Sequence, residues 1–363
     1  MVTHESAVKL VAVNGSTITS VIFIILVSMI AFCGNLLVFY VVARNQQLYT
    51  YTNAFIINIA VCHFIASIIV TAFIPPSLIS GQWIFGNSTS GNYSCDAIGF
   101  LIVVLFNVAI LTLTVISYIR YYSIKYPMTY TRLINKKRFF ILITYVWSQS
   151  IIMAVLPFFE SISSYEYNHA VGFCTIKPLG TFRFIDIIIT LILPFLTVFI
   201  LAIRILCLLY KNPKSQWRHK ISPMSDNNDT ALPVNSYSPR RRSYHPHNTI
   251  DKQVTYTLLV VVFVNWVLWL PLIVVMLLDS SLFGNQKSAE LAVYLLAFSS
   301  ISINPMMYGA LNRNFREGVT ELITRWTQHC SLYSCVCFTH DEDSNVNWLC
   351  YRKRKINIYI QEA

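Results

Sequence analysis

Seven long windows of this chain contain no charged side chain. A bilayer core about 30 Å thick needs roughly 20 apolar residues in each spanning helix, so such windows predict transmembrane helices. With 55% hydrophobic and 12% charged residues, the chain is too apolar for a soluble domain and too poor in charge for a disordered one. The windows run from Lys9 to Arg44, from Arg44 to Asp96, from Asp96 to Arg120, from Arg138 to Glu160, from Asp186 to Arg204, from Lys252 to Asp279 and from Glu290 to Arg313.

Two of these windows differ in length from a single helix. The second also holds a polar loop, residues 80–93, which leaves a span near Thr52 to Pro75. The fifth is short, and its apolar stretch extends outward past Asp186. We therefore expect an all-α fold, a seven-transmembrane helix bundle with an amphipathic eighth helix at the inner membrane surface. The expected boundaries are an N-terminal segment (1–17), the bundle with its eighth helix (18–327) and a C-terminal tail (328–363).

The positive charges are distributed unequally between the segments that connect the spans. In membrane proteins the basic residues of short loops stay on the cytoplasmic side. Lys9, Lys177, Arg183 and Lys287 fall on one side, whereas the many basic residues of the other connecting segments fall on the opposite side. We therefore expect an extracellular N-terminus and a cytoplasmic C-terminus. The net charge of +11 then reflects attraction to the anionic inner leaflet, and nucleic acid is not needed to explain it.

Sequons and cysteines agree with this orientation. Asn14, Asn87 and Asn92 begin Asn-x-Ser/Thr sequences in predicted outer segments, where glycosylation is possible. Of nine cysteines, Cys95 and Cys174 alone fall on the oxidising outer side, which predicts a disulfide between them. Sequons also arise by chance, so the charge distribution carries more weight.

Polar and proline residues lie inside the spans, where they are costly unless they have a role. Taken in chain order over residues 34–326, they resemble the marks of the rhodopsin-like (class A) G-protein-coupled receptors. One mark alone is weak, because a Trp-x-Pro sequence in an apolar segment is often ordinary packing, but the ordered set is specific. The marks are Gly34-Asn35, Asn58-Ile59-Ala60-Val61, Trp83-Ile84-Phe85-Gly86, Cys95, Arg120-Tyr121, Tyr126-Pro127, Trp147, Cys174, Pro194, Trp269-Leu270-Pro271, Asn304-Pro305-Met306-Met307-Tyr308 and Phe315.

The resemblance implies a conformational switch in the bundle. Proline inside a helix removes a backbone hydrogen bond and kinks the axis. In the family the inner half of the sixth helix swings outward on activation, and Trp269 beneath the ligand pocket senses binding. A static kink at Pro271 beside an ordinary core tryptophan is the alternative. The implied switch and G-protein-coupling residues are Arg120, Tyr121, Asp251, Trp269, Pro271, Asn304, Pro305 and Tyr308.

The switch region departs from the family pattern around its arginine. Ile119 stands where the family usually has an acid next to Arg120. We expect Arg120 to pair instead with Asp251 at the start of the sixth span, a contact worth about 0 to 1 kcal/mol when partly exposed. Asn265 replaces an aromatic residue beneath the kink, and Ala202 replaces a tyrosine that meets the arginine in active receptors. These departures put efficient, ligand-dependent coupling in doubt.

A further departure lies in the middle of the bundle. His63 stands where the family keeps a sodium-binding aspartate. A histidine near neutral pH supplies no fixed negative charge, so we expect no sodium site. We expect His63 to have a structural role rather than to sense protons, with hydrogen bonds to Asn35 and Asn304.

The resemblance also implies a ligand pocket that opens outward among the third, fifth, sixth and seventh spans. Ile102 replaces the aspartate of biogenic amine receptors, which disfavours an amine docked in that manner. Phe298 replaces the Schiff-base lysine of opsins, so covalent retinal is excluded and no cofactor is expected. Asp186 is costly in a membrane unless it is paired, so we expect either Arg183 or a cationic ligand beside it. The expected lining residues are Ile102, Phe106, Asn107, Asp186, Trp269, Leu272, Met276, Glu290 and Tyr294.

An apolar stripe at helical spacing follows the seventh span, with charged side chains between its members. It predicts an amphipathic helix on the inner membrane surface. The members of the stripe are Phe315, Val319, Leu322, Ile323 and Trp326. The cysteines after it either carry palmitate or remain free thiols; they are Cys330, Cys335 and Cys337. Residues 211–249 are rich in Ser, Pro, Asn and Arg without apolar periodicity, which predicts a disordered intracellular loop.

The leading functional interpretation is a plasma-membrane receptor that converts binding of an extracellular ligand into activation of a heterotrimeric G protein. The ligand expected from Asp186 is a small polar molecule or peptide with a positive group. The resemblance also implies arrestin and receptor kinases as partners, and membrane lipid surrounds the bundle. The departures leave open a receptor with constitutive or absent coupling. A transporter or membrane enzyme is disfavoured, because the spans show no internal repeat and no cluster of His, Asp or Glu able to hold a metal or activate water.

Overall fold

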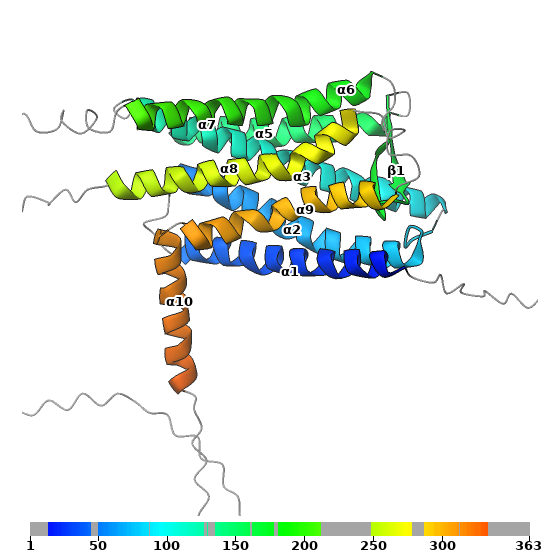
Figure 1. Cartoon of the computed structure of the whole chain (residues 1–363), viewed down its shortest axis with the longest axis horizontal. Helices are drawn as coiled ribbons and strands as arrows, with labels where there is room; N and C mark the ends of the chain where they lie inside the picture. The colour runs from blue at the N-terminus through cyan, green and yellow to red at the C-terminus, as the bar shows by residue number, and fades with distance from the viewer. Residues whose placement is uncertain are drawn as a thin grey trace, which may run out of the picture.

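Among the residues that it describes, the computed structural model of the chain has seven helices that are long and apolar enough to cross a membrane, which confirms the predicted fold class (Figure 1). The structure describes residues 14–44, 50–86, 88–126, 129, 135–159, 162–177, 181–211, 248–277, 287–311 and 313–332. The helices are α1 (Gly15–Arg44), α2 (Tyr51–Ser80), α3 (Thr89–Lys125), α5 (Lys136–Val155), α6 (Phe182–Ile187), α7 (Leu193–Lys211), α8 (Asn248–Leu277), α9 (Lys287–Leu311) and α10 (Arg313–Leu332), with a short 3₁₀ turn at Leu156–Phe158.

Polar side chains define where several helices begin. Thr50, Ser88 and Asn135 precede α2, α3 and α5, and each side chain accepts a hydrogen bond from the backbone N–H three residues later. Such caps satisfy a donor that the first helical turn leaves without a partner. The end of α2 differs from the prediction: the helix continues through Pro75 to Ser80 and stops where Gly81 adopts a φ of 70°. Glycine takes this left-handed conformation at little cost.

The fifth span combines three segments. A π-helical turn, Ile188–Ile192, joins α6 to α7. A turn of this kind carries one residue more than an α-helical turn and is frequent near functional sites. It places Asp186 in α6, before the turn, and Pro194 in α7, after it.

Helix α3 lies at the centre of the bundle. Among the described spans it has the largest share of buried residues. A hydrogen-bonded group ties it to its neighbours. Asn58 of α2 donates from Nδ2 to Thr112 Oγ1 of α3 (2.9 Å) and accepts at Oδ1 from Trp147 Nε1 of α5 (3.1 Å). The two polar marks Asn58 and Trp147 therefore act together to join three helices.

A two-stranded antiparallel hairpin, β1 (Ser164–Asn168) and β2 (Phe173–Lys177), lies at one end of the bundle. We call this the hairpin end, and the opposite end the α10 end. The turn before β2 fits closely against α2: Gly172 has a φ of 70°, and a Cβ there would lie 2.6 Å from Leu78 Cγ. The sequence analysis did not predict this hairpin.

At the other end, α10 runs across the bundle rather than along it (Figure 1). Phe315 is buried and packs against Val38 and Val41 of α1, while Arg316 and Thr320 are exposed. This agrees with the predicted amphipathic helix, which reaches Leu332. Asn87, Pro127, Cys335 and Cys337, together with residues 212–247 of the predicted loop, lie outside the described residues, as do the side chains of Trp326 and Cys330. The predicted domain limits at 17 and 327 stay predictions.

Candidate ligand pocket and switch

The hairpin is fastened to helices on two sides of the bundle. The predicted disulfide joins Cys174 of β2 to Cys95 of α3. Asn168, at the end of β1, donates a hydrogen bond from Nδ2 to Glu290 Oε1 of α9 (2.7 Å). Glu290, which we predicted to line the pocket, therefore has one carboxylate oxygen engaged by the hairpin. These attachments hold the hairpin against the helix ends where the pocket was expected to open.

Two tyrosines of β1 add further attachments through their hydroxyl groups. Tyr165 donates to the backbone carbonyl of Ala154 (2.7 Å), and Tyr167 donates to that of Ser77 (3.1 Å). Burial raises the pKa of Tyr167 to about 12. Its hydroxyl therefore remains a donor at neutral pH, and the hairpin stays bonded to α2.

An aromatic path leads from the hairpin into the bundle. Phe173 of β2 is 2% exposed, and its ring centroid lies 6.1 Å from that of Phe298 in α9. Phe298 contacts Phe106 of α3 (5.8 Å), which meets Trp269 of α8 edge to face (5.5 Å). The sequence analysis missed Phe173, although its position next to Cys174 fixes it beneath the hairpin.

The apolar residues predicted to line the pocket belong to one packed core. Ile102, Phe106, Trp269 and Leu272 are buried. Met276 and Tyr294 are half-buried and pack against that core, and the Tyr294 ring lies 6.2 Å from that of Phe298. The structure therefore brings together the apolar predicted residues of α3, α8 and α9.

Two polar groups of the predicted pocket have no hydrogen-bond partner among the described residues. The buried Asn107 Nδ2 has no acceptor, and no described side chain donates to the half-buried Asp186 carboxylate. Burial raises the pKa of Tyr165 above its ordinary value, and the negative charges of Asp186 and Asp96 add to the shift. A buried donor without an acceptor costs about 1–3 kcal/mol. The side chain of Arg183 lies outside the described residues, so its pairing with Asp186 stays a prediction.

The hinge region of α8 is tied to α7 on one side. Trp266 donates from Nε1 to the backbone carbonyl of Phe195 (3.0 Å), and the Phe195 ring also contacts Trp269 (6.2 Å). Asn265 turns back on its own helix, where its amide donates to the carbonyl of Val261 (2.8 Å). Direct contacts with α7 therefore lie two and five residues before Pro271 in α8, at Trp269 and Trp266.

At the α10 end, Arg120 is half-buried near the end of α3, and Ile119 beside it is fully buried. Tyr121 is buried and packs against α7, with the Lys125 ammonium 5.4 Å from the centre of its ring. Asp251 belongs to α8, but its side chain lies outside the described residues. The pair between Arg120 and Asp251 therefore stays a prediction. The same holds for the role of Tyr308, whose side chain is also outside them.

The expected hydrogen bonds of His63 are not formed, and that prediction was wrong. His63 Nδ1, Asn35 Oδ1 and Asn304 Oδ1 are buried without partners in the part of the chain that the structure describes. The amide of Asn35 donates to backbone carbonyls, one of them that of Ala31 (2.7 Å), instead of reaching the ring. The helix backbone thus competes successfully with the imidazole.

The comparisons with known proteins agree with this geometry. A family model, 7 transmembrane receptor (rhodopsin family), matches residues 34–308. The chain is 28% identical over 323 residues to the QRFP-like peptide receptor of Branchiostoma floridae, covering 85% of this chain and 78% of that protein. It is 26% identical over 313 residues to the histamine H2 receptor of Homo sapiens, covering 84% and 79%. Its fold is similar to that of squid rhodopsin, with a TM-score of 0.70 and 23% identity over 86% and 87% of the two chains. The chain belongs to the rhodopsin family of seven-transmembrane receptors.

Proposed function

We propose that this chain is a plasma-membrane receptor that converts ligand binding near the hairpin end into G-protein activation at the α10 end. The observation that carries the proposal is the aromatic path from Phe173 to Trp269, which lies two residues before Pro271. A ligand that packs differently against Trp269 in two states of the kink shifts the balance between them. The family match and the names of the relatives, a peptide receptor and a histamine receptor, support this function.

The proposed orientation places the hairpin end outside the cell. It is supported by the excess of basic residues in the segments at the α10 end. The disulfide at the hairpin end fits an oxidising compartment. Asn14 and Asn92, two of the predicted glycosylation sites, are exposed at the ends of α1 and α3 nearest the hairpin. Access of an antibody to an N-terminal tag on intact cells tests this orientation.

The proposed ligand is a small polar molecule or peptide with a positive group that pairs with Asp186. Its support is the carboxylate without a described hydrogen-bond donor, together with the unpartnered amide of Asn107. Ile102, which replaces the aspartate of biogenic amine receptors, adds no second negative charge to the pocket. An Asp186→Asn receptor keeps the size of the side chain and removes the charge. Loss of the dose response to a ligand found by screening supports this pairing, and an unchanged dose response refutes it.

G-protein activation in transfected cells tests the receptor function itself. Arg120→Ala removes the cation that the family uses at the α10 end, and Lys137→Ala removes an exposed cation at the start of α5. We expect Arg120→Ala to abolish agonist-stimulated activation and Lys137→Ala to leave it unchanged, at equal surface expression. Equal signalling from both variants would contradict the proposal.

A receptor with constitutive or absent coupling is the second candidate. It is favoured by Ile119, which is fully buried where the family keeps an acid, and by Ala202 in the fifth span. Two measurements separate the candidates: a constitutive receptor activates the G protein without agonist, and a receptor with absent coupling does not activate it even with agonist. Arrestin and receptor kinases are proposed as further partners at the α10 end. Membrane attachment through α10 and through palmitate on Cys330, Cys335 and Cys337 is proposed as well.

A further inference from the structure

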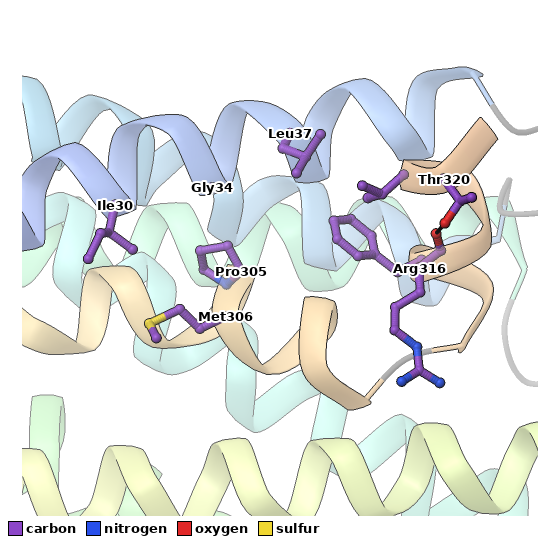
Figure 2. A pocket seen from close by; sticks show the side chains of 9 residues that line it. Ile30, Gly34, Leu37, Pro305, Met306, Arg316 and Thr320 are labelled. Carbon is purple, nitrogen blue, oxygen red and sulfur yellow. Dashed lines mark hydrogen bonds between the residues drawn. The ribbon is translucent and has the colours of Figure 1, made fainter. Parts of the chain in front are cut away.

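A groove opens on the outer surface of the bundle where α1, α9 and α10 meet (Figure 2). Its volume is about 360 Å³, within the range of about 300–1,000 Å³ that is usual for small-molecule sites. Its walls are mostly apolar, with Ile30 and Leu37 contributed by α1, Met306 by α9 and Val319 by α10. Arg316 is the charged residue of the lining. The groove lies on a different face from the candidate ligand pocket.

Two close helix contacts occur at this groove, one within it and one beside it. A Cβ on Gly34 would lie 2.7 Å from Pro305 Cβ, and a Cβ on Gly318 would lie 2.7 Å from Val41 Cγ1. Glycine at these positions lets α1 touch α9 at one place and α10 at another. Around these contacts the side chains of α1, α9 and α10 line the open space. The position of the groove is therefore set in part by how closely the three helix backbones approach one another.

The groove extends from the membrane surface into one leaflet. α1 ends at Arg44, and a rise of 1.5 Å per residue places Gly34 about 15 Å and Ile30 about 21 Å from that end. Half of a bilayer core about 30 Å thick is about 15 Å. The groove thus has the depth of an acyl chain in the leaflet at the α10 end, which is the inner leaflet in the orientation proposed above.

The charge of the groove lies at its surface end. Arg316 is exposed on α10, and Figure 2 shows its side chain extending away from Leu37 and α1. A long arginine side chain covers apolar surface with its stem and keeps its head in the polar layer. A guanidinium also matches a phosphate group in geometry and charge. The apolar slot and the cation are therefore arranged as the tail and headgroup of a phospholipid require.

We propose that this groove binds one anionic glycerophospholipid of the inner leaflet, with an acyl chain between α1 and α9 and its phosphate at Arg316. The proposal relies on the orientation stated under the proposed function, but not on G-protein coupling. Bound lipid joins α10 to α1 and α9, so it fixes the position of α10 against the seventh span.

Native mass spectrometry of the full chain in detergent tests the site, with dioleoyl-phosphatidylserine and dioleoyl-phosphatidylcholine added in turn. We expect one phosphatidylserine to bind about fivefold more tightly than phosphatidylcholine, the factor that corresponds to one basic residue at an anionic membrane surface. Arg316→Ala should remove this preference, whereas Lys137→Ala should keep it. A detergent measurement has no sidedness, so an inverted orientation or a lack of coupling does not affect the result.

Space-filling variants test the slot itself. Leu37→Trp fills the groove, whereas Leu36→Trp adds the same bulk to a neighbouring residue that does not line it. We expect Leu37→Trp to abolish the tight lipid adduct and Leu36→Trp to retain it; Ile30→Trp serves if Leu37→Trp fails to fold. Equal binding by a folded groove variant and Leu36→Trp would overturn the proposal. It would also be overturned if a groove variant removed only a sterol adduct or a dimer of the chain, because the occupant would then be that species.

Discussion

The backbone carbonyl of Ile301 in α9 accepts a hydrogen bond from Asn35 Nδ2 of α1 (3.0 Å). This carbonyl is four residues before Pro305, which has no N–H to offer it. Asn35 therefore replaces, from a neighbouring helix, the bond that the proline removes. The Gly34-Asn35 pair thus has two functions: the glycine gives the Pro305 ring room, and the asparagine satisfies the freed carbonyl.

Replacing Asn35 by alanine should destabilise the bundle by about 1–3 kcal/mol, because it leaves the Ile301 carbonyl buried without a partner. The measurement is the thermal unfolding temperature of the purified chain in detergent. Thr197→Ala is the control, since that exposed hydroxyl donates to the carbonyl of Leu193 in its own helix. If the two variants unfold at the same temperature, Asn35 does not have this role.

The close contact of Gly34 with Pro305 can be tested by adding one methyl group to the glycine. Gly34→Ala would place a Cβ 2.7 Å from Pro305 Cβ, and overpacking of this kind typically costs about 1–3 kcal/mol. Gly15→Ala is matched to it, because no atom lies within 4 Å of a Cβ there. We expect a lower unfolding temperature for Gly34→Ala alone. A stability like that of the wild type would mean that α1 and α9 are free to separate.

The aromatic path predicts that Phe173 stabilises the core from the hairpin. Phe173→Ala should cost about 3 kcal/mol, the lower part of the range for truncating a buried phenylalanine. Phe159→Ala removes an exposed ring near the same end of the bundle and should change stability by less than about 0.5 kcal/mol. Thermal unfolding of both variants measures the difference. An equal loss in the two would show that the Phe173–Phe298 contact contributes little.

The hairpin attachment through Tyr167 should be sensitive to alkaline pH. Its pKa in the folded protein is about 12, above the ordinary value of 10.0. Below pH 10 both folded and unfolded chains keep the proton, so the contribution to stability is complete. Between about pH 10 and 12 the unfolded chain loses the proton first, and stability falls. Unfolding temperatures across this range should fall less steeply for Tyr167→Phe than for the wild type, whereas Tyr93→Phe, at an exposed ring, should behave like the wild type.

The spans were predictable from sequence because a lipid environment imposes a strong constraint: charged side chains are rare where a helix crosses the membrane. The disulfide followed from the side of the membrane on which Cys95 and Cys174 fall. The end of α2 was less predictable, since Pro75 lies in a helix that continues for one more turn before Gly81 ends it. Proline marks a missing hydrogen bond, and it does not by itself stop a helix whose neighbours remain bonded.

The polar contacts inside the bundle were harder to predict, because an amide has several acceptors within reach. Asn35 bonds to backbone carbonyls and not to His63, a choice that depends on the position of α9 relative to α1. Phe173, the buried residue of β2, was missed for a related reason. Its loop carries no hydrophobic periodicity, and only the pairing of β1 with β2 shows that the ring points into the core.

The π-helical turn at Ile188–Ile192 has a consequence for the direction of the Asp186 side chain. An α-helix turns about 100° per residue, so deleting the single residue Ile189 would restore regular winding and rotate everything before it by about that angle. The carboxylate would then leave its present face while every pocket side chain kept its identity. The number of residues in this one turn, and not only the identity of the side chains, therefore determines which ligands can contact the Asp186 carboxylate.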